Sequence, residues 1–231
     1  MDGLLLIDKP SGPTSHDIVD AVRRITKLRA VGHAGTLDPF ATGLLILGVG
    51  KATKWLTALV GLDKTYEATL TLGATSDSFD RDGVITPYPN LSTTPPSEAA
   101  VEQVLQKYRG SFEQLAPLYS AKKLNGKKLY ELARAGTATE AMRPTKLITI
   151  HALEVLSYAH PILQLRVTSS SGTYIRSLAD DIGRDLHTGA YLTELRRTAI
   201  GSYQVTNAHS ITSLTQETVE AKLIRKLDNL A

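Results

Sequence analysis

One aspartate lies in a setting that suits catalysis as well as a turn. Asp38 stands between Leu37 and Pro39 in GHAGTLDPFATGLL, residues 32–45. Proline disfavours the α conformation for the residue before it and brings no backbone N–H donor. We therefore expect the carboxylate on a preset, extended loop. Because Asp-Pro pairs are common in ordinary turns, this residue alone leaves a catalytic and a structural interpretation open.

An arginine provides the second candidate. Arg176 lies in SSSGTYIRSLADDIG, residues 169–183, within the first turn of a helix that the pattern predicts over 173–186. The positive end of the helix dipole is there, so a guanidinium calls for a carboxylate partner. That partner is either Asp180, one turn later on the same helix, or a carboxylate elsewhere in the fold.

Aromatic and basic side chains form a third group. Tyr66, in KTYEA, opens a predicted strand and is either a core residue or a surface on which a base stacks. The segment 115–136, LAPLYSAKKLNGKKLYELARAG, interleaves tyrosines with cations, which suits RNA as well as a solvated face. Its members are Tyr119, Lys122, Lys123, Lys127, Lys128, Tyr130 and Arg134.

The amino-acid composition excludes several kinds of chemistry. The chain has no cysteine, which excludes disulfides, thiolate metal sites and thiol nucleophiles, and its six histidines show no metal-ligand spacing. In the acidic loop ATSDSFDRDG, Pro89 stands where a calcium loop would end in glutamate. Phosphate-binding glycine motifs are missing, so we expect no cofactor and no metal. The net charge of +3 weakly favours a polyanionic partner.

The elements that must position these residues follow from hydrophobic spacing and turn signals. We expect strands near 4–7, 43–50, 64–72, 147–156, 162–169 and 191–203. We expect helices near 15–28, 51–59, 97–108, 129–135, 173–186 and, as one or two short segments, 208–231. The proline-rich stretch 86–97 is expected to be a linker or surface excursion. This irregular alternation favours an α+β fold with a mixed, mainly antiparallel central sheet flanked by helices.

Seven segments resemble, in order, the motifs of the TruB family of tRNA pseudouridine synthases. They are GLLLIDKPSGPTSHD, GHAGTLDPFATGLL, KTYEA, SDSFDRDG, YSAKKLNGKKLYELARAG, SGTYIRSLADDIG and LTELRRTAIG, between residue 3 and about residue 201. The resemblance implies the pseudouridine synthase fold. It also implies conversion of uridine 55 in the T-loop of tRNA to pseudouridine, without cofactor or metal.

The resemblance assigns roles to individual residues. Asp38 matches the essential aspartate, Arg176 the arginine that pairs with it, and Tyr66 the tyrosine that stacks on the target base. His33 matches a histidine that packs against the RNA where the flipped nucleotide has left its loop. Further contacts with RNA or with the pocket wall are expected from Lys64, Lys122, Arg143, Tyr174 and Leu195.

The chemistry supports a nucleophilic role for Asp38. Uracil must leave the ribose at N1, rotate and rejoin through C5, which requires a nucleophile near C1′ and C6 and a closed pocket for the free base. Attack at C1′ and addition at C6 both remain open. A bidentate arginine would orient the carboxylate and favour its charged form.

The expected organisation is one catalytic domain over 1–231, with a core to about 205 and a helical extension over 206–231. That extension is too short for the small C-terminal RNA-binding PUA domain of many relatives, which disfavours a guide-RNA-dependent enzyme of the dyskerin type. A noncatalytic tRNA folding chaperone is the alternative from another class. We expect a cytoplasmic monomer that binds the T-arm of tRNA and no membrane, since the N-terminus fits neither a signal peptide nor a membrane span.

Overall fold

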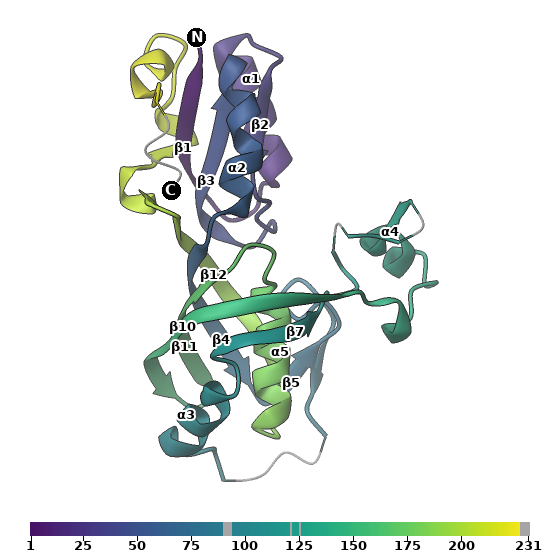
Figure 1. Cartoon of the computed structure of the whole chain (residues 1–231). Coiled ribbons are helices and arrows are strands. Elements are labelled where there is room, and N and C mark those ends of the chain that lie inside the picture. The colour runs from purple at the N-terminus through teal and green to yellow at the C-terminus, as the bar shows by residue number, and fades with distance from the viewer. Residues whose placement is uncertain (90–93, 121, 125, 227–231) are drawn as a thin grey trace. The chain divides into compact units, whose positions relative to one another are not determined.

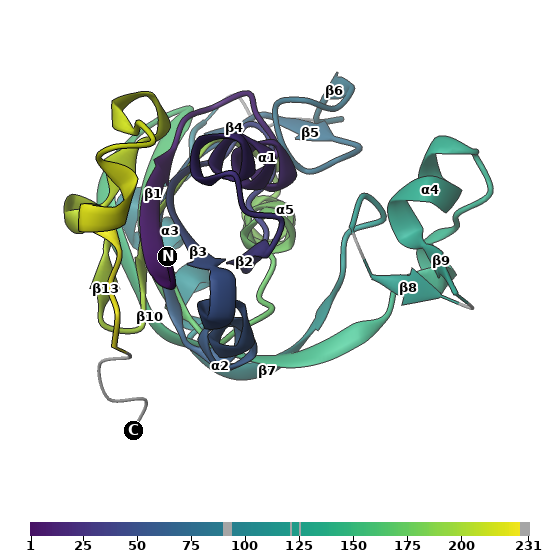
Figure 2. The same cartoon turned by 90° about the horizontal axis from the view of Figure 1, so that it is seen from above.

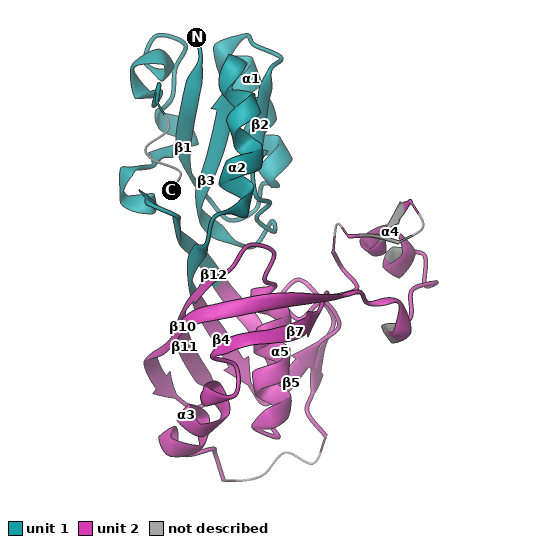
Figure 3. Ribbon diagram, in the orientation of Figure 1, with its two compact units in different colours: residues 1–67, 195–231 teal, residues 68–194 magenta. Residues whose placement is uncertain are grey.

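The computed structural model (Figure 1; Figure 2) describes residues 1–89, 94–120, 122–124 and 126–226. The chain forms two compact units (Figure 3): unit 1 comprises residues 1–67 and 195–231, and unit 2 comprises residues 68–194. Strands β4 (Lys64–Leu72) and β12 (Ala190–Ile200) contribute residues to both units.

Unit 1 is built around two long strands with nearly continuous apolar sequence. Strand β1 (Gly3–Lys9) pairs antiparallel with β3 (Thr42–Val49) over its whole length. Strand β2 (Val31–Ala34) pairs antiparallel with β3, and β12 pairs parallel with it. Both faces of β1 and β3 are buried, because alternate residues enter two different hydrophobic clusters. Burial on both faces explains why these strands read as apolar runs rather than as alternating patterns.

Helix α1 (Ser15–Thr26) covers one face of these strands through Ile18, Val19 and Val22, which share a cluster with residues of β1 and β3. Thr14 caps it: its side chain accepts from the Asp17 backbone, and the Asp17 carboxylate accepts from Thr14 in return. The helix predicted near 15–28 is thus confirmed, with Thr26 as its last residue.

The remaining elements of unit 1 are short. They are the 3-10 turn η1 (Gly50–Trp55), helix α2 (Leu56–Gly61), strand β13 (Tyr203–Gln204), turn η3 (Val205–Asn207), strand β14 (His209–Ser210) and turns η4 (Ile211–Ser213) and η5 (Val219–Lys222). In Figure 2 the C-terminal turns, in yellow, lie beside β1, with which η3 and η4 make contact.

Unit 2 is an antiparallel sheet with helices against it. Strand β10 (Thr145–Ala159) pairs with both β11 (Ile162–Ser169) and β7 (Gly110–Leu115), and the hydrogen-bonding order is β4, β11, β10, β7. Helix α5 (Ile175–Asp185) lies along this sheet (Figure 1), and α3 (Glu98–Gln106) contacts both α5 and β10. Strands β5 (Ala74–Ser76) and β6 (Ile85–Pro87) form a separate hairpin. Between β7 and β10 lie β8 (Lys123–Leu124), β9 (Lys127–Lys128), α4 (Leu129–Arg134) and η2 (Glu140–Met142).

The predicted fold class is confirmed: the structure is α+β with a large, mainly antiparallel sheet. The helices predicted over 208–231 are wrong for the described residues, where 3-10 turns and β14 stand instead. The helix predicted over 51–59 is a 3-10 turn followed by α2. Of the predicted linker over 86–97, residues 90–93 lie outside the described residues. No helix of the described chain is long and apolar enough to cross a membrane.

Candidate active site

The loop that carries Asp38, between β2 and β3, is tied to the turn that follows β1. The Ser15 hydroxyl donates to the Leu37 carbonyl at 3.0 Å and accepts from the Leu37 N–H at 2.9 Å. The N–H of Gly12 donates to the Pro39 carbonyl at 2.9 Å. Asp38 itself is half-buried. Backbone contacts on both sides of the aspartate therefore fix its position within unit 1.

A buried lysine completes this attachment. Lys9, at the end of β1, has no exposed surface, and its ammonium donates to the carbonyls of Pro10 at 2.9 Å, Pro13 at 2.8 Å and Pro39 at 3.1 Å. The last of these bonds joins it to the residue after Asp38. All three N–H donors of the ammonium are thus used to hold two turns together.

Burial lowers the pKa of Lys9 from its ordinary value of 10.5 to about 8. The Asp38 carboxylate opposes this shift and the Arg197 guanidinium adds to it, so three charges act on one another around the loop. The field of a carboxylate on an ammonium reports their proximity inside unit 1.

Arg197 closes the loop from the other side. This residue of β12 is 1% exposed, and its guanidinium donates from Nε to the Leu44 carbonyl at 2.8 Å and from Nη2 to the Gly35 carbonyl at 3.0 Å. Gly35 precedes Asp38 and Leu44 follows it, so a single side chain holds both ends of the segment. Gly43 has φ +101°, and a Cβ there would lie 2.2 Å from the Arg197 carbonyl oxygen. Only glycine fits that approach.

His33, in β2, is half-buried, and its Nδ1 is buried without a hydrogen-bond partner. Burial lowers the pKa of His33, and the charges of Arg197 and His16 lower it further. The imidazole is consequently neutral at neutral pH. A neutral ring can stack against a base or a ribose without burying a charge.

Three further predicted residues of unit 1 are buried. The Lys64 ammonium donates to the carbonyls of Val60, at 2.6 Å, and Leu62. It therefore stabilises the turn before β4, a role that sequence analysis did not anticipate. Tyr66 in β4 is 9% exposed and Leu195 in β12 is 7% exposed.

In unit 2, Arg176 lies in the first turn of α5, after the N-cap residue Tyr174, and is 5% exposed. Its guanidinium donates to the carbonyls of Ser78 and Tyr119, each at 2.9 Å. The same group lies 3.4 Å from the Asp80 carboxylate. The expectation that a carboxylate offsets this charge at a helix N-terminus is confirmed, and Asp80 from the acidic loop is one such partner.

Asp80 is held as firmly as its arginine. Its carboxylate accepts from the Ser78 hydroxyl at 2.6 Å and from the Asp82 N–H at 3.1 Å. Asp180, the helical alternative partner, forms an ion pair with Arg184 at 2.7 Å. The loop SDSFD therefore acts as a support for Arg176.

The other predicted residues of unit 2 have distinct settings. Gln114 binds the backbone of Tyr174 at both its N–H, 2.8 Å, and its carbonyl, 3.0 Å, which fixes the start of α5. Arg143 is buried, donates to the Ala116 carbonyl at 2.8 Å and lies over the ring of Phe79. Lys122 is exposed.

Of the predicted site residues, unit 1 contains His33, Asp38, Lys64, Tyr66 and Leu195, and unit 2 contains Lys122, Arg143, Tyr174 and Arg176. The predicted pairing of Asp38 with Arg176 stays a prediction. Among the described residues, no group of histidine and acidic side chains could hold a metal ion.

Sequence analysis missed Lys9, Asp80 and Arg197 as parts of these sites. Their sequence signals were weak, because each stands next to another charged residue: Asp8 beside Lys9, Arg81 beside Asp80 and Arg196 beside Arg197. The side chains of residues 123, 127, 128 and 134 in the basic segment lie outside the described ones.

Comparison with known proteins gives a consistent result. The model of the TruB family pseudouridylate synthase N-terminal domain matches residues 23–175, and that of the tRNA pseudouridylate synthase B C-terminal domain matches residues 176–230. The tRNA pseudouridine synthase B of Azoarcus sp. (strain BH72) is 47% identical over 214 residues, 93% of this chain and 70% of that protein. The enzyme of the same name from Burkholderia pseudomallei (strain 668) is 44% identical over 226 residues, 96% of this chain and 73% of that protein.

Solved structures agree at lower identity. A chain in the crystal structure of a Cbf5-Nop10-Gar1 complex is 30% identical with a TM-score of 0.71, over 92% of this chain. A chain in an H/ACA RNP bound to a substrate RNA containing 2′-deoxyuridine is 27% identical with a TM-score of 0.68, over 96% of this chain. The chain spans only 53% and 56% of the lengths of those two proteins. Family models covering most of its residues, together with relatives well above 30% identity, show that this chain belongs to the TruB family of pseudouridylate synthases.

Proposed function

We propose that this chain isomerises uridine 55 in the T-loop of tRNA to pseudouridine, with Asp38 as the nucleophile. Family membership and the names of the relatives support the reaction class and the tRNA substrate. The observation that carries the assignment of Asp38 is its loop, which Ser15, Lys9 and Arg197 hold from three different elements. Such restraint serves a group whose position matters for a reaction.

The rigid loop lowers the entropic cost of reaching the reactive geometry. The uracil must detach from C1′, rotate while held and rejoin through C5, so the attacking carboxylate has to stay in place through several steps. Hydrogen bonds from Lys9 to Pro39 and from Arg197 to Gly35 and Leu44 restrict the loop before the substrate arrives.

The remaining roles follow the same proposal. Arg176 pairs with Asp38 and Tyr66 stacks beneath the uracil, with about 1 to 3 kcal/mol of stacking energy. His33 packs against the RNA that the extruded nucleotide leaves, since reaching a base within a folded loop requires flipping it out. Further RNA or pocket contacts are proposed for Lys64, Lys122, Arg143, Tyr174 and Leu195.

Both units together form the proposed catalytic domain, residues 1–231, which acts as a monomer on the T-arm of tRNA. The cytoplasm is the proposed place of action because tRNA is the proposed substrate.

The test is tritium release from an unmodified tRNA transcript labelled at C5 of uridine. Wild-type protein should release about one equivalent from one T-loop uridine. Asp38→Asn removes the charge with little change in shape, and it should lower the rate at least about a thousandfold while tRNA binding persists. Asp63→Asn, at an exposed aspartate of the same unit, serves as the matched control and should keep full activity.

Two outcomes would contradict the proposal. Tight tRNA binding by folded wild-type protein without any tritium release would favour the folding chaperone. Undiminished release by Asp38→Asn would remove Asp38 from the chemistry and leave the synthase activity in place.

A further inference from the structure

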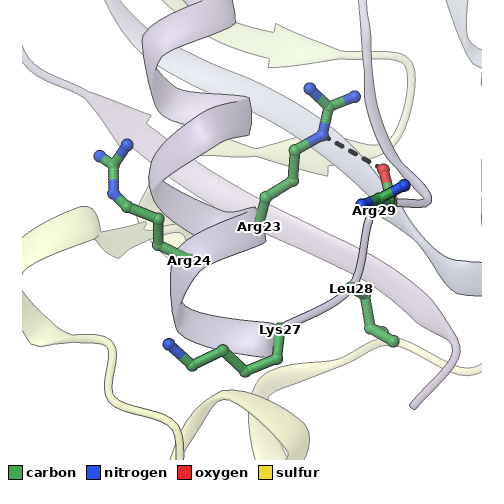
Figure 4. A pocket seen from close by; sticks show the side chains of 5 residues that line it. All are labelled: Arg23, Arg24, Lys27, Leu28 and Arg29. Atoms are coloured by element: carbon green, nitrogen blue, oxygen red, sulfur yellow. Dashed lines mark hydrogen bonds between the residues drawn. The ribbon is translucent and has the colours of Figure 1, made fainter.

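The end of α1 carries a concentration of positive charge that the proposed reaction does not use. Residues 20–31 contain four basic side chains and one acidic one, a net of +3, which equals the formal net charge of the whole chain. We call Arg24, Lys27 and Arg29 the α1 basic cluster. Together with Arg23 and Leu28, these residues line a hollow of about 320 Å³ (Figure 4).

Arg23 has a structural role that sets it apart from the cluster. Its guanidinium pairs with Asp20 at 2.9 Å and donates to the carbonyls of Arg29 at 3.2 Å and Val31 at 2.9 Å. These bonds fix the segment that follows the helix, and Leu28 packs against the hydrophobic core beneath it. The cluster therefore projects from ordered backbone, which lowers the entropic cost of binding a ligand there.

The three cluster side chains are exposed, and within the described part of the chain none of them has a hydrogen bond or an ion pair. Figure 4 shows Arg24 and Lys27 extending from the last turn of α1 and Arg29 on the segment beside it. Cations at a helix C-terminus stabilise the dipole by about 0.3 to 1 kcal/mol each, which accounts for Arg24 and Lys27. It does not account for Arg29, which lies beyond the C-cap Lys27 at φ 58°.

We propose that the α1 basic cluster binds the phosphodiester backbone of the RNA substrate at nucleotides other than the reacting uridine. This inference rests on the proposed function, which supplies the polyanion. Exposed cations on ordered backbone suit phosphate oxygens. An acidic protein surface is the less favoured partner, because the hollow has Leu28 as its single apolar residue and lacks the aromatic anchors of protein interfaces.

Helix α1 also connects the cluster to the proposed catalytic loop. Its first residue, Ser15, binds Leu37 beside Asp38, and the cluster begins near its other end. A helix of 12 residues spans about 18 Å at 1.5 Å per residue. A phosphate held at the cluster thus belongs to a nucleotide several positions from the one that reacts. Its loss affects substrate binding and leaves the chemical step in place.

The test is the salt dependence of tRNA affinity in the triple variant Arg24→Gln, Lys27→Gln, Arg29→Gln. Neutralised phosphates release counterions, so the slope of log affinity against log salt should fall by about 2 to 3, nearly one for each phosphate that is no longer neutralised. Affinity at low salt should fall about tenfold or more. In tritium release with the full chain, KM should rise while kcat changes by less than about twofold.

The matched control is the triple variant Lys107→Gln, Arg166→Gln, Arg225→Gln. These exposed cations each pair with a carboxylate, at 3.0, 3.5 and 3.1 Å, and their removal changes the net charge by the same amount. The control should keep the wild-type slope. A second variant, Arg24→Lys with Arg29→Lys, retains the charge and should also keep it, and thermal melts verify that every variant is folded.

Equal slopes for the cluster variant and wild type would overturn the inference, and so would an equal loss in the control, which would mean that net charge alone matters. These outcomes are separable from failure of the proposed function. A wild-type protein that binds tRNA through the cluster but releases no tritium would remove the synthase activity, whereas an active enzyme indifferent to the cluster would remove only this site.

Discussion

In each unit a buried arginine fixes a loop. The two arginines differ in their partners, because Arg176 faces a carboxylate and Arg197 binds carbonyl oxygens. In unit 2, Arg176 holds the carbonyls of Ser78 and Tyr119 and faces the carboxylate of Asp80. In unit 1, the hydrogen bonds of Arg197 within the described chain go to carbonyl oxygens. Its charge instead lowers the pKa values of Lys9 and His33.

This difference in partners indicates different roles for the two buried arginines. A buried ion pair offsets part of its own charge, so Asp80 gives Arg176 a counter-ion within its own unit. The buried cations of unit 1 concentrate positive charge around one loop, where the Asp38 carboxylate interacts with Lys9. Burying cations is costly, and under the proposed function this cost is offset because the cations hold the loop of the nucleophilic carboxylate in place.

The largest expected effect on stability comes from breaking the ion pair between Arg176 and Asp80. Arg176→Met leaves the buried Asp80 carboxylate without the Arg176 guanidinium, and such a loss costs about 3 to 5 kcal/mol of unfolding free energy. Urea unfolding measures it. The double variant Arg176→Met, Asp80→Leu removes both charges and should cost less than the sum of the two single variants. Additive costs would mean that Arg176 and Asp80 are not coupled. The electrostatic difference between the two units would then have no effect on stability.

A smaller effect on stability is expected in unit 1. Arg197→Met leaves the carbonyls of Leu44 and Gly35 without their donor, a loss of about 2 to 3 kcal/mol in unfolding free energy. Because the Asp38 loop loosens, kcat should fall under conditions where the variant is still fully folded. Rescue of the rate in Arg197→Ala by added guanidinium would sharpen this result. A stability loss equal to that of Arg176→Met, with unchanged kcat, would contradict it.

Lys9 predicts a pH dependence with opposite signs for activity and stability. Its pKa is about 8 in the folded chain and 10.5 ordinarily, so between these values the unfolded chain holds more protons. The contribution of Lys9 to stability therefore rises with pH over that window. Activity should fall as pH passes about 8, because a neutral amine has two N–H donors for three carbonyls and the hold on Pro39 weakens.

Profiles of kcat and of urea unfolding against pH measure both effects. Lys9→Met cannot titrate and should show low activity without a step near pH 8. A wild-type profile of kcat that stays flat to pH 9.5 or so would contradict the role given to the ammonium.

The smallest effect concerns His33. Since Arg197 contributes to its lowered pKa, Arg197→Met should raise the pKa of His33 towards the ordinary value, while burial keeps it below. The imidazole proton signals in a pH titration by NMR measure this shift, with His33→Gln identifying the resonance. An unchanged pKa of His33 would mean that the charge of Arg197 does not act on His33.

The comparison also shows which elements local signals could predict. Helix α1 was predicted because its cap at Thr14 and the spacing of Ile18 and Val22 are local. Strand β2 was not, because VGHA has no strand pattern of its own and becomes a strand by pairing with β3. After residue 208 the error was the opposite one, because helices were predicted where the structure has short 3-10 turns. Their apolar residues Leu214, Val219 and Leu223 pack individually against the core of unit 1, so no continuous helix is needed to bury them.

The sequence by itself determined the fold class, the main strands and helices, the family, and the position of Asp38 on a restrained loop. Only the tertiary structure decided what restrains that loop. Arg197 reaches Gly35 across 162 residues of sequence, and Arg176 reaches Ser78 across 98. Short-range spacing reports which residues can form a helix or strand, whereas a buried charge finds its partners only when distant strands bring them within hydrogen-bond distance.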